Sequence, residues 1–103
     1  MKNYQQQVLD PIEKNKPVTQ RLIKAVLGIA CESGKLSALV KRLVFESKEI
    51  DRGDVLDALG DLLWYMTSAA KAVGKSLDEV AAANIEKLIR QGRIEVPTRA
   101  QKP

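Results

Sequence analysis

The chain has 103 residues and a mass of 11.4 kDa, with 45% hydrophobic and 29% charged residues. These values predict one small globular domain and exclude an intrinsically disordered chain. The sequence has no histidine and a single cysteine, Cys31. It therefore excludes histidine-based catalysis, an intrachain disulfide and a zinc site built from histidine or cysteine. Any metal site must use oxygen ligands, which favours Mg2+ or Mn2+.

The sequence also bears on location and partners. No apolar run is long enough to span a membrane, and the first residues, MKNYQQQ, lack the apolar core of a signal peptide. We therefore expect a cytoplasmic protein with no membrane partner. The formal net charge of +4 permits a nucleic-acid partner but does not require one. Part of this charge lies in residues 93–103, for which we predict a flexible basic tail.

The apolar pattern along the chain is helical. Residues 1–14 have room for a short helix that Pro11 interrupts or begins. After Pro17, with Thr19 as the expected N-cap, the spacing predicts a long amphipathic helix from Gln20 to about Glu46. Its apolar stripe consists of Leu22, Val26, Ile29, Leu36, Val40 and Leu43. Gly34 interrupts the helix at a cost of about 1 kcal/mol, which predicts a close packing or ligand contact there.

Two more helices follow. Asp51 or Asp54 is expected to cap a helix that ends at Val73 and Gly74. Ser76 and Glu79 match a capping box, and Gly92 closes the helix that they open. The sequence shows no strand-like alternation of useful length. We therefore predict an all-α domain over residues 1–92, followed by the tail.

Three groups of polar residues are candidates for chemistry. Asp54, Asp57 and Asp61 share one helix face, either as ligands for a cation or as a capping residue followed by solvated acids. Glu32 flanks the apolar stripe, and Lys35 lies within reach of it, either at a site or in an ordinary surface ion pair. The third group lies on the last helix and offers an amide and two cations to phosphate oxygens. It consists of Asn84, Lys87 and Arg90.

Four segments in this order resemble the MazG-like nucleotide pyrophosphohydrolases of the all-α nucleoside triphosphate pyrophosphohydrolase superfamily. They are GIACESGKL, LVKRLVFESKEID, VLDALGDLLWYM and SLDEVAAANIEKLIR, and they lie between about residues 20 and 90. The resemblance implies a four-helix bundle completed by dimerisation, as a homodimer or a dimer of dimers. It also implies Mg2+-dependent cleavage of a nucleoside triphosphate to a monophosphate and pyrophosphate, a house-cleaning activity on nucleotide pools.

The resemblance assigns the site residue by residue. The family motif has four metal-binding acids, E-x-x-E and then E-x-x-D. Glu32 matches the first acid and Asp61 the fourth, so these two are the expected catalytic residues. Lys35 stands at the second position and Ala58 at the third. Asp57 is a substitute ligand, although it lies about 100° round the helix from Ala58.

The expected metal ligands are therefore Glu32, Asp61 and Asp57, and the ion is Mg2+ or Mn2+, bound weakly or not at all. The expected phosphate-binding residues are Lys35, Asn84, Lys87 and Arg90. Lys35 is also hypothesised to form salt bridges with Glu32 and Asp61 in place of the metal.

Several interpretations stay open. The chain is either a pyrophosphohydrolase with unusual metal ligands, including acids from a partner subunit, or a catalytically weakened relative that binds nucleotides or a partner. A small helical interaction or nucleic-acid-binding module is the least favoured, because the basic residues do not cluster on one helix face. Trp64 and Tyr65 suit base stacking, a core or a dimer interface. The length of the apolar stripe predicts self-association.

Overall fold

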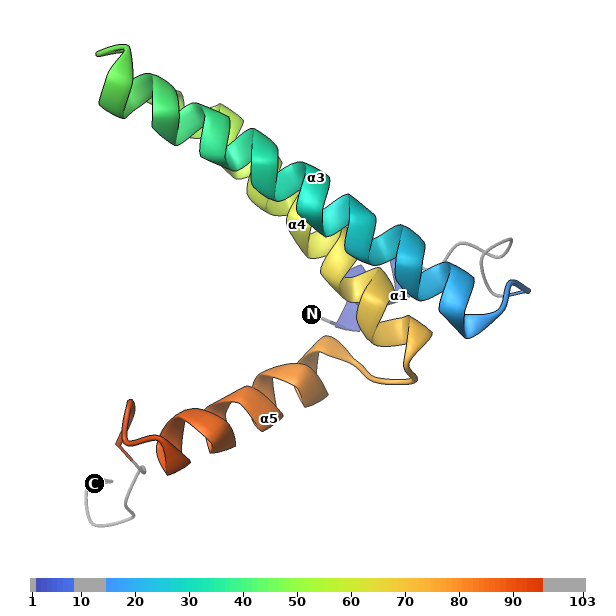
Figure 1. The fold of residues 1–103 in the computed structure, drawn as a ribbon. Helices are drawn as coiled ribbons and strands as arrows, with labels where there is room; N and C mark the ends of the chain where they lie inside the picture. The colour runs from blue at the N-terminus through green and yellow to red at the C-terminus, as the bar shows by residue number, and fades with distance from the viewer. Residues whose placement is uncertain (1, 9–14, 96–103) are drawn as a thin grey trace.

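The computed structural model describes residues 2–8 and 15–95, and this part of the chain contains helices but no strand. The helices are α1 (Lys2–Gln7), α3 (Val18–Phe45), α4 (Arg52–Ala72) and α5 (Leu77–Arg90), as Figure 1 shows. The all-α prediction is confirmed. Pro11 and most of the predicted tail, residues 96–103, lie outside the described residues.

The long helix α3 begins directly after Pro17, whose φ of −55° is already suited to the start of a helix. Pro17 is the N-cap, so the prediction that Thr19 caps this helix is wrong. The helix ends at Phe45, and Ser47 follows in the left-handed region with φ 53°. Its 28 residues extend about 42 Å at 1.5 Å per residue.

The ends of α4 and α5 agree with the predicted capping signals. The Asp51 carboxylate accepts hydrogen bonds from the backbone N–H groups of Gly53 at 2.8 Å and Asp54 at 3.3 Å. Ser76 and Glu79 form both bonds of a capping box. Gly74 has φ +76° and Gly92 has φ +70°, conformations that other residues rarely adopt. Short-range sequence signals therefore fix where these two helices begin and end.

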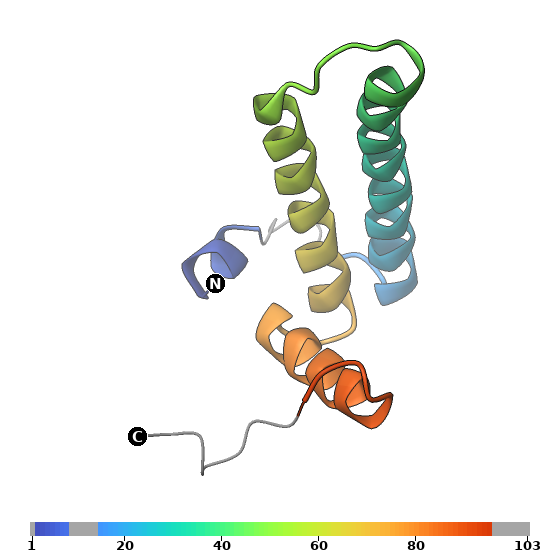
Figure 2. The same ribbon diagram turned by 90° about the vertical axis from the view of Figure 1, so that its left-hand side faces the viewer.

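The helices α3 and α4 lie side by side and antiparallel, while α5 leaves the end of α4 in another direction (Figures 1 and 2). The short helix α1 lies at the turn between α4 and α5. There the Gln5 side chain accepts a hydrogen bond from the backbone N–H of Leu77 at 2.7 Å. The backbone carbonyl of Gln5 accepts a second hydrogen bond, from the Lys71 ammonium. Gln5 therefore connects α1 to both sides of the turn.

The two helices of the hairpin come into tight contact at Gly28. A Cβ atom at this position would lie 2.6 Å from Cγ of the Tyr65 ring. Only glycine therefore allows the ring to lie against the backbone of α3. The sequence predicted a close packing or ligand contact at Gly34. The packing contact is absent, because a Cβ atom at Gly34 would meet nothing within 4 Å, and the ligand contact stays a prediction.

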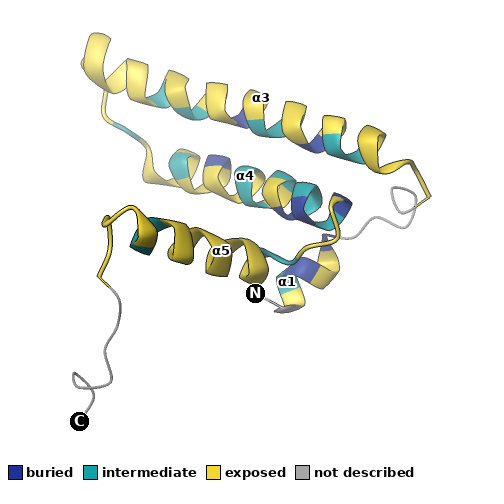
Figure 3. Ribbon diagram, turned by 60° about the horizontal axis from the view of Figure 1, so that its bottom comes forward, coloured by how far each residue is buried: buried dark blue, intermediate teal, exposed yellow. Residues whose placement is uncertain are grey.

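The buried core of the described chain is small. Its apolar members are mostly alanines: Val8, Ala25, Ala58, Ala70 and Ala72. Many larger apolar side chains on α3 and α4 face solvent instead (Figure 3). The described helices of a single chain therefore leave much apolar side-chain surface exposed.

Candidate functional site

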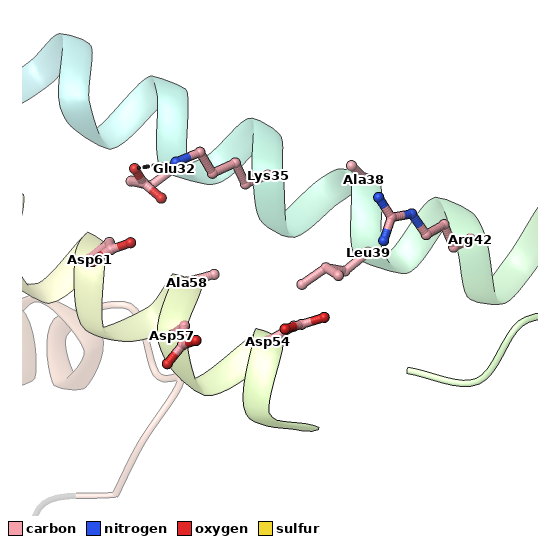
Figure 4. A pocket seen from close by; sticks show the side chains of 9 residues that line it. All are labelled: Glu32, Lys35, Ala38, Leu39, Arg42, Asp54, Asp57, Ala58 and Asp61. Atoms are coloured by element: carbon pink, nitrogen blue, oxygen red, sulfur yellow. Dashed lines mark hydrogen bonds and ion pairs between the residues drawn. The ribbon is translucent and has the colours of Figure 1, made fainter. Parts of the chain in front are cut away.

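A cavity of about 270 Å3 lies between α3 and α4. We call it the acidic groove, because four acids and only two bases line it together with three apolar side chains (Figure 4). The full lining is Glu32, Lys35, Ala38, Leu39, Arg42, Asp54, Asp57, Ala58 and Asp61. The residues on one side of the groove belong to α3, and those on the other side belong to α4. The groove therefore depends on how these two helices pair.

Glu32 is the most unusual residue of the groove. It follows Ala25 by seven residues, so the two share the face of α3 that packs against α4. Glu32 is accordingly only 6% exposed, although it carries a carboxylate. A buried carboxylate is costly unless a cation or hydrogen-bond donors accompany it. The environment of Glu32 therefore decides what this groove can bind.

Lys35 supplies that cation. Its Nζ atom lies 3.1 Å from Oε1 of Glu32, and this ion pair is drawn in Figure 4. The hydrogen bond to Glu32 and the charge of that carboxylate raise the pKa of Lys35, with a smaller contribution from Asp61. The second carboxylate oxygen of Glu32, Oε2, is buried and has no hydrogen-bond partner. One carboxylate oxygen of Glu32 therefore accepts a hydrogen bond from Lys35, and the other has no hydrogen-bond partner.

The groove brings together the three acids that were expected as metal ligands. Glu32, Asp57 and Asp61 all line it, and Asp54 joins them. Asp57 also lines this cavity, although its position on α4 is about 100° round the helix from that of Ala58. Ala58 itself is buried at 6% exposure, so a methyl group stands where the resemblance places an acid. The hypothesis about Lys35 is confirmed in its contact with Glu32, whereas Asp61 acts on Lys35 only through space.

The three candidate phosphate-binding residues on α5 are elsewhere. Asn84, Lys87 and Arg90 are all exposed, and none of them lines the acidic groove. Figure 1 shows α5 running away from the hairpin. Within one chain, Lys35 is therefore the single candidate phosphate-binding residue that lies in the groove with the acids.

Two residues near the groove were not among the predicted site residues. Arg42 lines it, three residues after Leu39 and seven after Lys35, and this spacing could have identified it. Tyr4 on α1 is the other. Burial and, to a lesser extent, the negative charge of Asp61 raise the pKa of the Tyr4 hydroxyl. No sequence signal connects Tyr4 to Asp61, because their proximity depends on how α1 packs.

The residues of the groove do not fit a magnesium site as they are arranged. Among residues 2–8 and 15–95, no three side chains of histidine, cysteine, aspartate or glutamate come close enough together to hold a metal ion. Glu32 has one oxygen bonded to an ammonium group, and an ammonium beside the carboxylate opposes a divalent cation. The expectation of Mg2+ or Mn2+ stays a prediction.

Comparisons with protein-family models, with curated proteins and with solved structures find no match to this chain. In the described part of the chain, no helix is both long enough and apolar enough to cross a bilayer. The groove and its ion pair are therefore the observations on which a function has to rest.

Proposed function

We propose that this chain is a catalytically weakened MazG-like nucleotide pyrophosphohydrolase, which binds nucleoside triphosphates but releases pyrophosphate from them slowly or not at all. One observation carries the proposal: the ion pair between Lys35 and the buried carboxylate of Glu32. In the family resemblance these two residues occupy the first and second metal-binding positions. The ion pair leaves Glu32 a single open oxygen, and its cation repels a divalent ion.

Charge decides where a triphosphate would bind. The groove carries Glu32 and three aspartates against Lys35 and Arg42, so it repels a phosphate chain that arrives without a cation. Asn84, Lys87 and Arg90 on α5 offer an amide and two cations to solvent instead. We therefore expect the phosphates to bind to α5. Cleavage of the triphosphate, which the family resemblance places in the groove, is then the step that is weakened.

A second candidate function is pyrophosphate release with a different set of ligands. The observation that favours it is that Asp54, Asp57 and Asp61 line one cavity with Glu32. In that case the three aspartates of α4 would replace the two missing acids. Activity of the unaltered chain with Mg2+ or Mn2+ distinguishes this candidate from the first.

The test is pyrophosphate release from a panel of ribonucleoside and deoxyribonucleoside triphosphates with Mg2+ or Mn2+. The parent chain is compared with a Lys35→Glu, Ala58→Glu double variant, which supplies the two missing acids. A Lys41→Glu, Ala82→Glu variant is the matched control, because it changes the charge equally at exposed positions outside the groove. Binding of a non-hydrolysable triphosphate analogue to each protein is measured by calorimetry.

We expect the parent and the control to bind the analogue without releasing pyrophosphate, and the Lys35→Glu, Ala58→Glu variant to release it. Release by the parent at a rate similar to that of this variant would overturn the proposal in favour of the second candidate. If no protein binds the analogue or releases pyrophosphate, the assignment to nucleotides is wrong.

The proposal includes self-association and a cytoplasmic location. The resemblance calls for a four-helix bundle, and one hairpin supplies only two of its long helices. What supports a second copy is the number of large apolar side chains on α3 and α4 that are exposed, among them Val26, Leu59 and Met66. A cytoplasmic place in nucleotide-pool house-cleaning follows from the expected substrate alone.

A further inference from the structure

The aspartates of the acidic groove lie in a row and do not gather round one point. Asp54, Asp57 and Asp61 follow each other on α4 at spacings of three and four residues, so they lie within about 60° of each other round the helix. These two spacings measure about 4.5 Å and about 6 Å along the helix axis. All three side chains are exposed. They therefore present three negative charges in a line of about 10 Å.

Glu32 adds an acceptor to one end of this row. It is only 6% exposed, and its Oε2 atom is buried without a hydrogen-bond partner. Figure 4 shows its carboxylate in the space between α3 and α4, near Asp61. A buried carboxylate oxygen that accepts no hydrogen bond costs free energy. A ligand that donates to Glu32 and Asp61 together would remove this cost.

The groove already binds one alkylammonium group. The Nζ atom of Lys35, at the end of four methylene groups, lies 3.1 Å from Oε1 of Glu32. Among the acids of the groove, Glu32 alone forms an ion pair with another described residue. Ala38, Leu39 and Ala58 also line the groove and can contact methylene groups. The lining therefore combines unpaired carboxylates with apolar side chains, as suits an aliphatic chain that carries several positive charges.

The same arrangement disfavours other charged ligands. Mg2+ needs near-octahedral oxygen ligands around one point, and within residues 2–8 and 15–95 no three acids come close enough together to hold a metal ion. An anion is repelled, because four acids and two bases line the groove. The formal charge of the whole chain is +4, so a polycation has no general attraction to this protein. Its attraction is confined to the groove.

We propose that the acidic groove binds a linear aliphatic polyamine with three ammonium groups, separated by three and by four methylene groups. An extended chain advances about 1.2 Å per bond, so its nitrogen atoms are about 5 Å and about 6 Å apart. These intervals match those from Asp54 to Asp57 and from Asp57 to Asp61. The terminal ammonium next to Asp61 also supplies the donor that Oε2 of Glu32 lacks.

The first test is calorimetry of the parent chain at low ionic strength, without nucleotide. Spermidine has the required spacing, hexaamminecobalt(III) has the same charge in a compact ion, and putrescine has only the longer interval. We expect spermidine to bind at least tenfold more tightly than hexaamminecobalt(III) and at least fivefold more tightly than putrescine. The proposal would be overturned if spermidine did not bind, if the compact ion bound equally well, or if Mg2+ bound more tightly than spermidine.

The second test locates the polyamine in the groove. Asp57→Asn and Asp61→Asn each remove one charge of the row and should weaken spermidine binding at least fivefold. Asp78→Asn is the matched control, because Asp78 is an exposed acid on α5 outside the groove. Equal affinities of the groove variants and the control would contradict the proposal.

This inference goes beyond the proposed function and does not rest on it. The comparison of ligands uses only the parent chain, so it decides the question even where a variant fails to fold. Neither test contains a nucleoside triphosphate or measures pyrophosphate. Polyamine binding and the nucleotide assignment can therefore fail separately.

Discussion

The Tyr65 ring of α4 lies against the backbone of α3 at Gly28, so closely that a Cβ atom there would approach the ring Cγ to 2.6 Å. We expect Gly28→Ala to destabilise the chain by about 1–3 kcal/mol, because the ring has to move away and the helices separate. Urea unfolding followed by circular dichroism measures the change.

Gly34→Ala is the matched control, since it makes the same substitution in the same helix with nothing within 4 Å of the new methyl group. It should stabilise the chain by up to about 1 kcal/mol through helix propensity alone. Equal effects of the two substitutions would mean that the ring does not pack on Gly28.

The buried carboxylate of Glu32 gives a second prediction. Glu32→Met removes an oxygen that is buried without a hydrogen-bond partner and fills the same space with an apolar side chain. We expect the free energy of unfolding to rise by about 1–3 kcal/mol. Lys35→Met should lower it, because Glu32 then stays buried without its cation. A Lys35→Met variant as stable as the parent would show that the ion pair does not compensate the burial of Glu32.

The stability of the parent should also depend on pH through the Lys35 ammonium. The folded state raises the pKa of Lys35 above its usual value of 10.5, chiefly through the hydrogen bond to Glu32. The resulting stabilisation is complete below pH 10.5 and is lost as the pH rises through the raised folded pKa. The free energies of unfolding of the parent and of Lys35→Met should therefore converge once the pH exceeds the raised folded pKa of Lys35. If the difference in stability between the two proteins stayed constant from pH 8 to above the folded pKa of Lys35, the stabilising ion pair with Glu32 would be contradicted.

The capping box of α5 gives a prediction at acid pH. The Ser76 backbone N–H donates to the Glu79 carboxylate and lowers the pKa of that group below its usual value of 4.5. The stabilisation is therefore present above pH 4.5 and is lost as the pH falls through the lowered folded pKa. Glu79→Ala should unfold more easily than the parent at pH 7, and the difference should shrink below pH 4. Helix content followed by circular dichroism during urea unfolding measures both.

Gln5 should hold the start of α5 in place. Gln5→Ala removes the oxygen that accepts the hydrogen bond from the Leu77 N–H, at an expected cost of about 0.5–1.5 kcal/mol. The Leu77 amide should then exchange with deuterium several-fold faster. Gln6→Ala is the control, because Gln6 is exposed on the same short helix. Unchanged exchange at Leu77 in Gln5→Ala would show that α5 is placed by other contacts.

The sequence predicts the helix ends well, because the residues that determine them are close together in the sequence. Asp51, the pair Ser76 and Glu79, and the glycines at helix ends each act through neighbours within a few residues. The long-range features are different. The packing role of Gly28 instead of Gly34, and the position of Tyr4 near Asp61, depend on helices that are distant in sequence. The pairing of Lys35 with Glu32 lies between these cases, since helical spacing predicts it but only packing buries Glu32.

The two hydrogen bonds of Gln5 also bear on the order in which the chain folds. They join residues 66 and 72 positions apart in the sequence, whereas the hairpin of α3 and α4 closes over a short loop. Closing the longer loop costs more chain entropy, so it should form only after the hairpin provides a surface for it. We expect α1 to dock last, and α5 to take its final direction in that same step.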